Sequence, residues 1–196
     1  MKAPSRQIRF VVALPSEAKP INHYFKLIRD NNAAPFSLYR NHGVALVISG
    51  IGSEFSEQAT RWLSKLLPEP AVWINAGIAG HSHLPIGEAL LASEILQQSS
   101  GKRWRTILPT PPPCGSAPLI TCGQPETVYP HSALYDMEAA GFYTAASAVA
   151  PPHRIHCFKI VSDNPQCPVH SINRELITQL MNDQLHLLEH LSNTRI

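Results

Sequence analysis

The sequence has little charge of either sign, and its few charged residues are spread along the chain. Charged residues make up 15% of the 196 residues, and the formal net charge is only +2. A nucleic-acid-binding surface or a helix that lies on an anionic membrane needs clustered lysine and arginine, because a polyanion is held by a local positive potential. The sequence therefore favours neither a nucleic-acid partner nor an anionic membrane.

Long apolar runs and paired metal-binding motifs are also missing. No stretch approaches the roughly 20 apolar residues that a bilayer-spanning helix needs, and the N-terminal segment MKAPSRQIR lacks the apolar core of a signal peptide. The four cysteines form no CxxC pair, and two of them lie in apolar runs where a reduced, buried thiol is typical. His186 and His190 have a spacing that suits a metal, but no third ligand is near in the sequence. We therefore expect a cytoplasmic protein with no membrane association, metal or cofactor.

Apolar, β-branched runs alternate with amphipathic patterns along the chain. Several of the runs are continuously apolar, as expected for strands that are covered on both faces. Strands that alternate with helices predict a layered α/β domain with a largely parallel or mixed sheet, and the length predicts a single domain over residues 1–196. The predicted strands are residues 8–14, 44–50, 71–77, 88–95, 117–123 and 156–163, and the predicted helices are residues 16–30, 53–67, 134–149 and 171–191.

One segment breaks this alternation. Residues 109–118, PTPPPCGSAP, hold five of the 18 prolines. Proline lacks an N–H group and has a fixed φ, so the segment is expected to form neither a helix nor a central strand. We predict an extended surface connection, with a polyproline II partner-binding motif as the alternative.

Two glycine-rich segments follow predicted strands. SGIGSEF (49–55) leads from a strand into a helix, where backbone N–H groups can contact phosphate or ribose, and NAGIAGHSHLPIGE (75–88) reads as a second turn at a strand end. Ligands gather at the carboxyl ends of strands in open α/β sheets. Neither segment completes a GxGxxG fingerprint or a P-loop. Tight turns need glycine for structural reasons alone, so each segment is compatible with a ligand site or with a plain turn.

Acidic residues stand at the same strand ends. Glu17 follows the first predicted strand, and Asp163 ends the last one. Both could be carboxylates that stabilise a helix start. Glu138 falls on the apolar face of the predicted helix 134–149, where an acid is costly to bury unless something binds it. Asp136 is turned about 200° away from Glu138 on a helix and is expected to flank the helix start.

Six segments, taken together, resemble the purine nucleoside phosphorylase/uridine phosphorylase superfamily. They are VVALPSEAKP, LVISGIGSEFSEQAT, WINAGIAG, LPIGEALLASE, YDMEAAG and KIVSDNP, and they occur in the family's order. The likeness is greatest to the hydrolytic branch, the methylthioadenosine/S-adenosylhomocysteine nucleosidases. This resemblance implies a three-layer single domain with a central mixed β-sheet flanked by helices. It also implies hydrolysis of the N-glycosidic bond of a purine nucleoside, with a 5′-substituted adenosine as substrate, and self-association as a homodimer.

The resemblance assigns roles to individual positions. Glu17 would activate the attacking water, and Asp163 would protonate N7 of the purine. Breaking the bond builds positive charge on the ribose and negative charge on the base, and an acid beside the base with anions near the sugar stabilises both. Six further positions would contact the substrate. They are Met137, Glu138, Ala79, Gly80, Lys159 and Tyr129.

The sequence also departs from the family. Ile78 stands where the family has a serine, and Lys159 stands where it has an arginine, which keeps the charge but loses the fork geometry. The short segment 95–137 leaves Tyr129 as the candidate for stacking on the base. The phosphorylases place an arginine at the position of Asn75, so water is favoured as the nucleophile. Phosphorolysis and a degenerate, non-catalytic nucleoside-binding relative are the alternatives.

Overall fold

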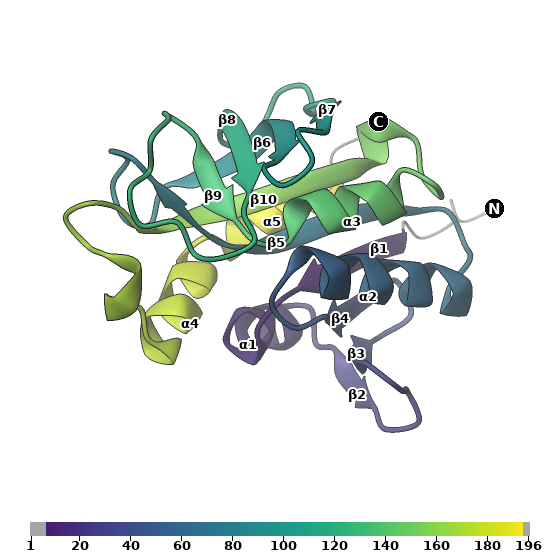
Figure 1. Cartoon of the computed structure of the whole chain (residues 1–196). Coiled ribbons are helices and arrows are strands. Elements are labelled where there is room, and N and C mark those ends of the chain that lie inside the picture. Colours follow the sequence, from purple (N-terminus) through teal and green to yellow (C-terminus); the bar gives the residue numbers. More distant parts are fainter. Residues whose placement is uncertain (1–6, 194–196) are drawn as a thin grey trace.

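The computed structural model describes residues 7–193, and within them it has five α-helices and a mixed sheet of ten strands (Figure 1). Residues 1–6, which hold most of the segment in which we expect no signal peptide, lie outside the described residues, as do residues 194–196. No helix within the described part of the chain is both long and apolar enough to cross a membrane.

Four parallel strands form the middle of the sheet. They are β4 (Val44–Ile48), β1 (Gln7–Val12), β5 (Ala71–His81) and β10 (Ile155–Asp163), in that spatial order. Every residue of β10 is buried, including the polar His156, Lys159, Ser162 and Asp163, so this strand is covered on both faces. Parallel strands bring their carboxyl ends to one edge, which places the segments after β1, β5 and β10 close together.

The sheet closes on itself beside this middle part. β6 (Ala89–Gln97) pairs with β10, β8 (Gly115–Thr121) pairs with β6, and β9 (Leu134–Asp136) pairs with both β8 and β5, so that five strands form a closed ring. The predicted α/β class with a mixed sheet is confirmed. The plain three-layer arrangement is corrected to a sheet that is partly a five-stranded barrel. The closure depends on the length of β5, because its last residues, Gly80 and His81, reach β9.

Helices cover both faces of the sheet. In Figure 1, α2 and α3 lie in front of it and α5 lies behind. Two separate groups of buried side chains follow from this arrangement, one under α2 and α3 and the other under the remaining helices. The helices are α1 (Pro15–Tyr24), α2 (Ser53–Leu66), α3 (Ala139–Ala146), α4 (Arg174–Asp183) and α5 (Leu185–Asn193).

Several predicted elements are shorter or divided in the structure. The predicted helix 134–149 begins only at Ala139, because Leu134–Asp136 is strand β9, which is buried between β8 and β5. Strand pairing here outweighs the helical spacing of the apolar residues. The predicted helix 171–191 is divided into α4 and α5. The remaining elements are β2 (Ile28–Asp30), β3 (Ser37–Arg40), β7 (Arg103–Arg105), and the 3₁₀ turns η1 (Pro152–Arg154) and η2 (Val169–Ser171).

The proline-rich segment 109–118 is only partly the surface connection that the sequence predicts. Its last four residues form the start of β8, which pairs with β6. Pro118 is accommodated because the register between the two strands shifts there, opposite Glu94.

Candidate active site

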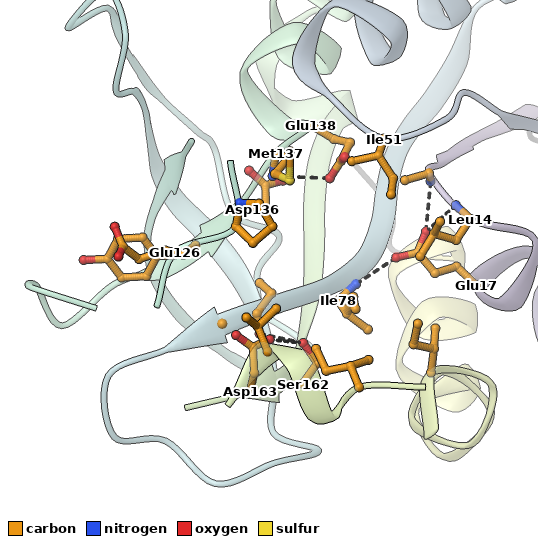
Figure 2. Close-up of a pocket in the computed structure, with 18 residues that line it drawn as sticks. Leu14, Glu17, Ile51, Ile78, Glu126, Asp136, Met137, Glu138, Ser162 and Asp163 are labelled. Atoms are coloured by element: carbon orange, nitrogen blue, oxygen red, sulfur yellow. Dashed lines mark hydrogen bonds between the residues drawn. The ribbon is translucent and has the colours of Figure 1, made fainter. Parts of the chain in front are cut away.

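A cavity of about 240 Å³ opens at the carboxyl ends of β1, β5 and β10 (Figure 2). Six of the eight predicted site residues line it, and they come from four separate parts of the chain. They are Glu17 in α1, Ala79 and Gly80 in β5, Met137 and Glu138 between β9 and α3, and Asp163 at the end of β10. The structure therefore brings together at this cavity residues from five of the six segments on which the resemblance rests.

Glu17 is held against the cavity by the backbone around it. Its Oε2 accepts hydrogen bonds from the N–H groups of Ala13 and Leu14, both at 2.9 Å, and its Oε1 accepts one from Ile78 at 3.1 Å. The side chain fits because residue 77 is glycine, since a Cβ there would lie 2.5 Å from Oε1. Glu17 thus joins the start of α1 to β5.

The charge state of Glu17 reflects a balance of opposing effects. Burial raises the pKa of this carboxyl group, while the positive charge of Lys159 and the three backbone N–H groups oppose the rise. A carboxylate with a raised pKa is a better proton acceptor than an exposed one and still carries its charge once it has lost the proton. Glu17 therefore has the properties of a general base.

Glu138 enters the cavity from the residue that caps α3, not from the apolar face of a longer helix as the sequence predicts. Its Oε1 accepts the N–H of Gly52 at 2.8 Å, and its Oε2 accepts that of Met137 at 3.3 Å. Burial and the nearby charge of Asp136 raise the pKa of Glu138 to about 7. Glu138 is only 8% exposed, so water does little to stabilise its charge. Sugar hydroxyl groups that donate hydrogen bonds to the carboxylate would favour the charged form instead.

Asp136 and Lys159 form a buried ion pair beside Glu138. The Lys159 Nζ lies 2.8 Å from Asp136 Oδ2, and Thr121 donates to the other carboxylate oxygen at 2.8 Å. Asp136 also accepts the N–H of Ala139, which confirms the expectation that it flanks the start of α3. Although burial opposes it, the charges of Asp136 and Glu138 raise the pKa of Lys159. Lys159 does not line the cavity and acts on it through its charge.

Asp163 is buried at the end of β10, and both of its carboxylate oxygens accept hydroxyl hydrogen bonds. Ser162 donates to Oδ1 and Tyr129 donates to Oδ2. Tyr129 itself does not line the cavity, and its ring packs edge-on against Tyr135 with the ring centres 5.7 Å apart. The structure therefore places Tyr129 beside the acid, whereas the sequence makes it the candidate for stacking on the base.

The remaining lining residues give the cavity its character. Leu14, Ile51, Ile78, Val169, Ile172 and Ile177 make an apolar wall. The charged residues that line the cavity are all acidic, and no lysine, arginine or histidine of the described chain is among its lining residues. Sequence reasoning missed Ser162 as a partner of Asp163, although the two are adjacent in the VSD segment, and it missed Glu126. The cavity suits a neutral, hydroxyl-rich ligand with an apolar substituent.

Comparisons with known proteins agree with this fold. No family model matches the sequence, and no curated protein matches it. Among solved structures, the fold is similar to the 5′-methylthioadenosine nucleosidase of Arabidopsis thaliana, with 17% identity over 98% of each chain and a TM-score of 0.83. It is also similar to the S-adenosylhomocysteine nucleosidase of Streptococcus pyogenes, with 16% identity over 100% of each chain and a TM-score of 0.80.

A third neighbour is the futalosine hydrolase of Helicobacter pylori, with 14% identity over 95% of this chain and 97% of that one and a TM-score of 0.74. The chain therefore shares its fold with these two nucleosidases and with this futalosine hydrolase. At these identities the likeness establishes the fold, and the residues of the cavity carry the argument about function.

Proposed function

We propose that the chain is an N-glycosyl hydrolase that cleaves a purine nucleoside, a 5′-substituted adenosine of the methylthioadenosine type, and releases the base. The observation that carries this proposal is the convergence of Glu17, Glu138 and Asp163 on one cavity of a nucleosidase fold. We assign each acid a different part of the reaction.

The reaction divides among these residues as follows. Asp163 gives a proton to N7 of the base as the bond from C1′ to N9 breaks, which neutralises the departing base. Glu17 takes a proton from the water whose oxygen forms the new bond to C1′. Glu138 accepts hydrogen bonds from the ribose hydroxyl groups, and Ala79 and Gly80 line the same cavity. At the end Asp163 has lost a proton and Glu17 has gained one, so exchange with solvent resets the site.

The charge of the cavity supports water over phosphate as the nucleophile. A phosphate dianion needs cations, usually arginines that bind it in a bidentate way. The cationic side chain beside the site, Lys159, is already paired with Asp136. Asn75, at the position where the phosphorylases have an arginine, is buried and donates to Val11 O at 3.0 Å.

The apolar wall supports a small, uncharged 5′ group. Val169 in η2, Ile172 just after it and Ile177 in α4 line the cavity. A methylthio group would gain from burial against them, at about 0.8 kcal/mol for each CH₂. An anionic 5′ tail would instead meet a cavity whose charged residues are all acidic. We therefore expect methylthioadenosine to be a better substrate than a nucleoside with a carboxylate tail.

The proposed enzyme is a cytoplasmic protein that forms a single domain over residues 1–196. Residues beside the cavity support its self-association. Ile51, Phe55 and Leu66 are large apolar residues that are 51%, 54% and 45% exposed. Phe55 and Leu66 lie about three turns apart on one face of α2. Ile51 also lines the cavity. A second copy of the chain that covered this face would bury these side chains and narrow the mouth of the site, as a homodimer.

A screen for base release tests the substrate class. The compounds are methylthioadenosine, S-adenosylhomocysteine, adenosine, inosine and futalosine, each in phosphate-free buffer, and the measurement is free adenine or hypoxanthine by chromatography. We expect adenine release to be fastest from methylthioadenosine. Turnover of inosine and adenosine alone, with none of the 5′-substituted compounds, would contradict the proposed substrate.

A further inference from the structure

Tyr129 makes a contact that its predicted role does not explain. Its hydroxyl group donates a hydrogen bond to Oδ2 of Asp163, across 34 residues of sequence. The side chain is 4% exposed. Burial and the bond to Asp163 raise the pKa of Tyr129, so its hydroxyl keeps its proton and stays a donor throughout the physiological pH range.

The chain around Tyr129 is shaped to keep this contact. Tyr129 has a φ of 51°, a backbone conformation that residues other than glycine adopt rarely and at some cost. Its ring passes beside Gly80, where a Cβ would lie 2.5 Å from both the ring and Asp163 Oδ2. Tyr135 packs edge-on against the same ring. Backbone conformation, a glycine and a second ring therefore all fix the hydroxyl at the carboxyl group.

The contact determines how Asp163 can act. Ser162 holds Oδ1 and is itself within 3.3 Å of the Ala79 carbonyl, so the two hydroxyl groups together fix the plane of the carboxyl group. General acid catalysis requires the acid to lie within hydrogen-bond reach of the atom that it protonates. A hydroxyl that donates to the carboxyl group also stabilises the anion that remains after the proton has left.

We propose that Tyr129 is a positioning residue for Asp163, which holds its carboxyl group for proton transfer to the base and stabilises the carboxylate that this transfer leaves. The inference rests on the proposed function. Its consequence is that Tyr129 matters only where the leaving group needs a proton, and that it contributes little to binding of the ribose or of the 5′ group.

The test compares two substrates that differ in their need for an acid. Methylthioadenosine needs a proton on its base, whereas 4-nitrophenyl 5-methylthioriboside releases nitrophenolate, which leaves without one. For Tyr129→Phe we expect kcat for methylthioadenosine to fall by about tenfold or more, with KM changed by less than about twofold, since an acid catalyst contributes roughly 100-fold to 10,000-fold in all. We expect kcat for the nitrophenyl compound to change by less than about threefold on the same basis.

Two controls separate the possible results. Tyr143→Phe removes another buried hydroxyl, which contacts the Arg105 carbonyl at 3.3 Å, and should leave both rates unchanged. Because both substrates are measured on one preparation, their ratio does not depend on the fraction of Tyr129→Phe that is folded. Equal losses for both substrates would overturn the positioning role while the wild-type activity still supported the proposed function. A wild-type protein that releases no base would instead refute the proposed function itself.

Discussion

Glu17 presents a carboxylate that already accepts three backbone N–H groups, so its orientation is set before any substrate binds. For Glu17→Gln we expect kcat on methylthioadenosine to fall by at least about 100-fold, because the amide cannot accept the proton of the attacking water. Binding of the substrate, measured by calorimetry, should change by only a few-fold. Glu54→Gln, an exposed acid in the first turn of α2, is the matched control and should have no effect.

The raised pKa of Glu17 also predicts the direction of the pH dependence. A general base works only when it has lost its proton, so kcat should fall as the pH drops through the pKa of Glu17. Because burial raises that pKa, the fall should occur at a higher pH than an exposed glutamate would give. A wild-type rate that stays constant down to pH 4 would contradict the assignment, as would an unchanged rate in Glu17→Gln.

Glu138 links function to stability. Its pKa is raised from 4.5 to about 7 in the folded protein, so the folded state binds the proton more tightly than the unfolded state does. The resulting stabilisation of the fold is complete below pH 4.5 and is lost as the pH rises through 7. Glu138→Gln stays neutral, and the variant should gain stability relative to the wild type between pH 5 and pH 8, on the order of 1–3 kcal/mol. Urea unfolding at both pH values measures this difference.

The same substitution should weaken substrate binding, because an amide accepts sugar hydroxyl bonds less strongly than a carboxylate does. For the stability measurement, Glu175→Gln is the control, because Glu175 is an exposed acid at the start of α4. Its free energy of unfolding should show no pH-dependent gain over the wild type. A Glu138→Gln variant that loses stability relative to the wild type as the pH rises would show that the buried charge is not costly.

The contact of α2 with α3 shapes the site at the level of whole elements. Gly141 lies so close to α2 that a Cβ would be only 1.8 Å from the Ser53 carbonyl oxygen. The neighbouring N–H of Gly52 is the one that holds Glu138. The start of α2 therefore lies close enough for Gly52 to bind Glu138 only because α3 has a glycine at the crossing.

Gly141→Ala should separate the two helices. We expect the free energy of unfolding to fall by about 2 kcal/mol or more, since the clash involves backbone and outweighs the roughly 1 kcal/mol that alanine gains in a helix. KM should rise as Gly52 moves away from Glu138. Gly123→Ala is the control, because a Cβ there meets nothing within 4 Å, and it should change neither quantity. A Gly141→Ala variant as stable as the wild type would rule out the close packing.

The elements that the sequence predicts correctly are those with a strong burial signal. The predominantly apolar runs of β1, β5 and β10 are visible because these strands are covered on both faces. Strand β9 is invisible, because it has three residues and Leu134 falls in step with the helical spacing that follows it. The glycine-rich segment from Gly77 reads as a turn, yet β5 continues through it, since the glycines make room for the acids and do not bend the chain.

The sequence predicts the location of those site residues that lie at the carboxyl ends of strands. Glu17 and Asp163 follow strands whose carboxyl ends meet at one edge of the sheet, where ligands gather, and the cavity lies there. Their roles, by contrast, rest on the family resemblance, because a strand-end carboxylate alone is equally compatible with a helix start. The positions of Lys159 and Tyr129 could not be predicted, because each is fixed by a partner distant in the sequence, Asp136 and Asp163 respectively. Spacing along the chain carries no information about such pairs.

At the scale of the whole molecule, five strands close into a barrel and α2 has an exposed apolar face beside the cavity. If two copies associate through this face, Phe55→Glu should convert the dimer to a monomer, because the charge would have to be buried in an apolar interface. Sedimentation equilibrium measures the mass. In the monomeric Phe55→Glu variant, KM for methylthioadenosine should also rise, since Ile51 beside this face lines the cavity. Val128→Glu, an exposed apolar residue away from α2, should stay dimeric, and a monomeric wild type would exclude the interface.

The identity of the nucleophile tests the central claim most directly. The wild-type protein is incubated with methylthioadenosine in phosphate-free buffer made with H₂¹⁸O, and the sugar product is reduced at once and analysed by mass spectrometry. We predict that adenine is released and that one ¹⁸O atom is found at C1 of the methylthioribose. Turnover that begins only when phosphate is added, with the sugar recovered as its 1-phosphate, would contradict hydrolysis in a cavity lined by acids.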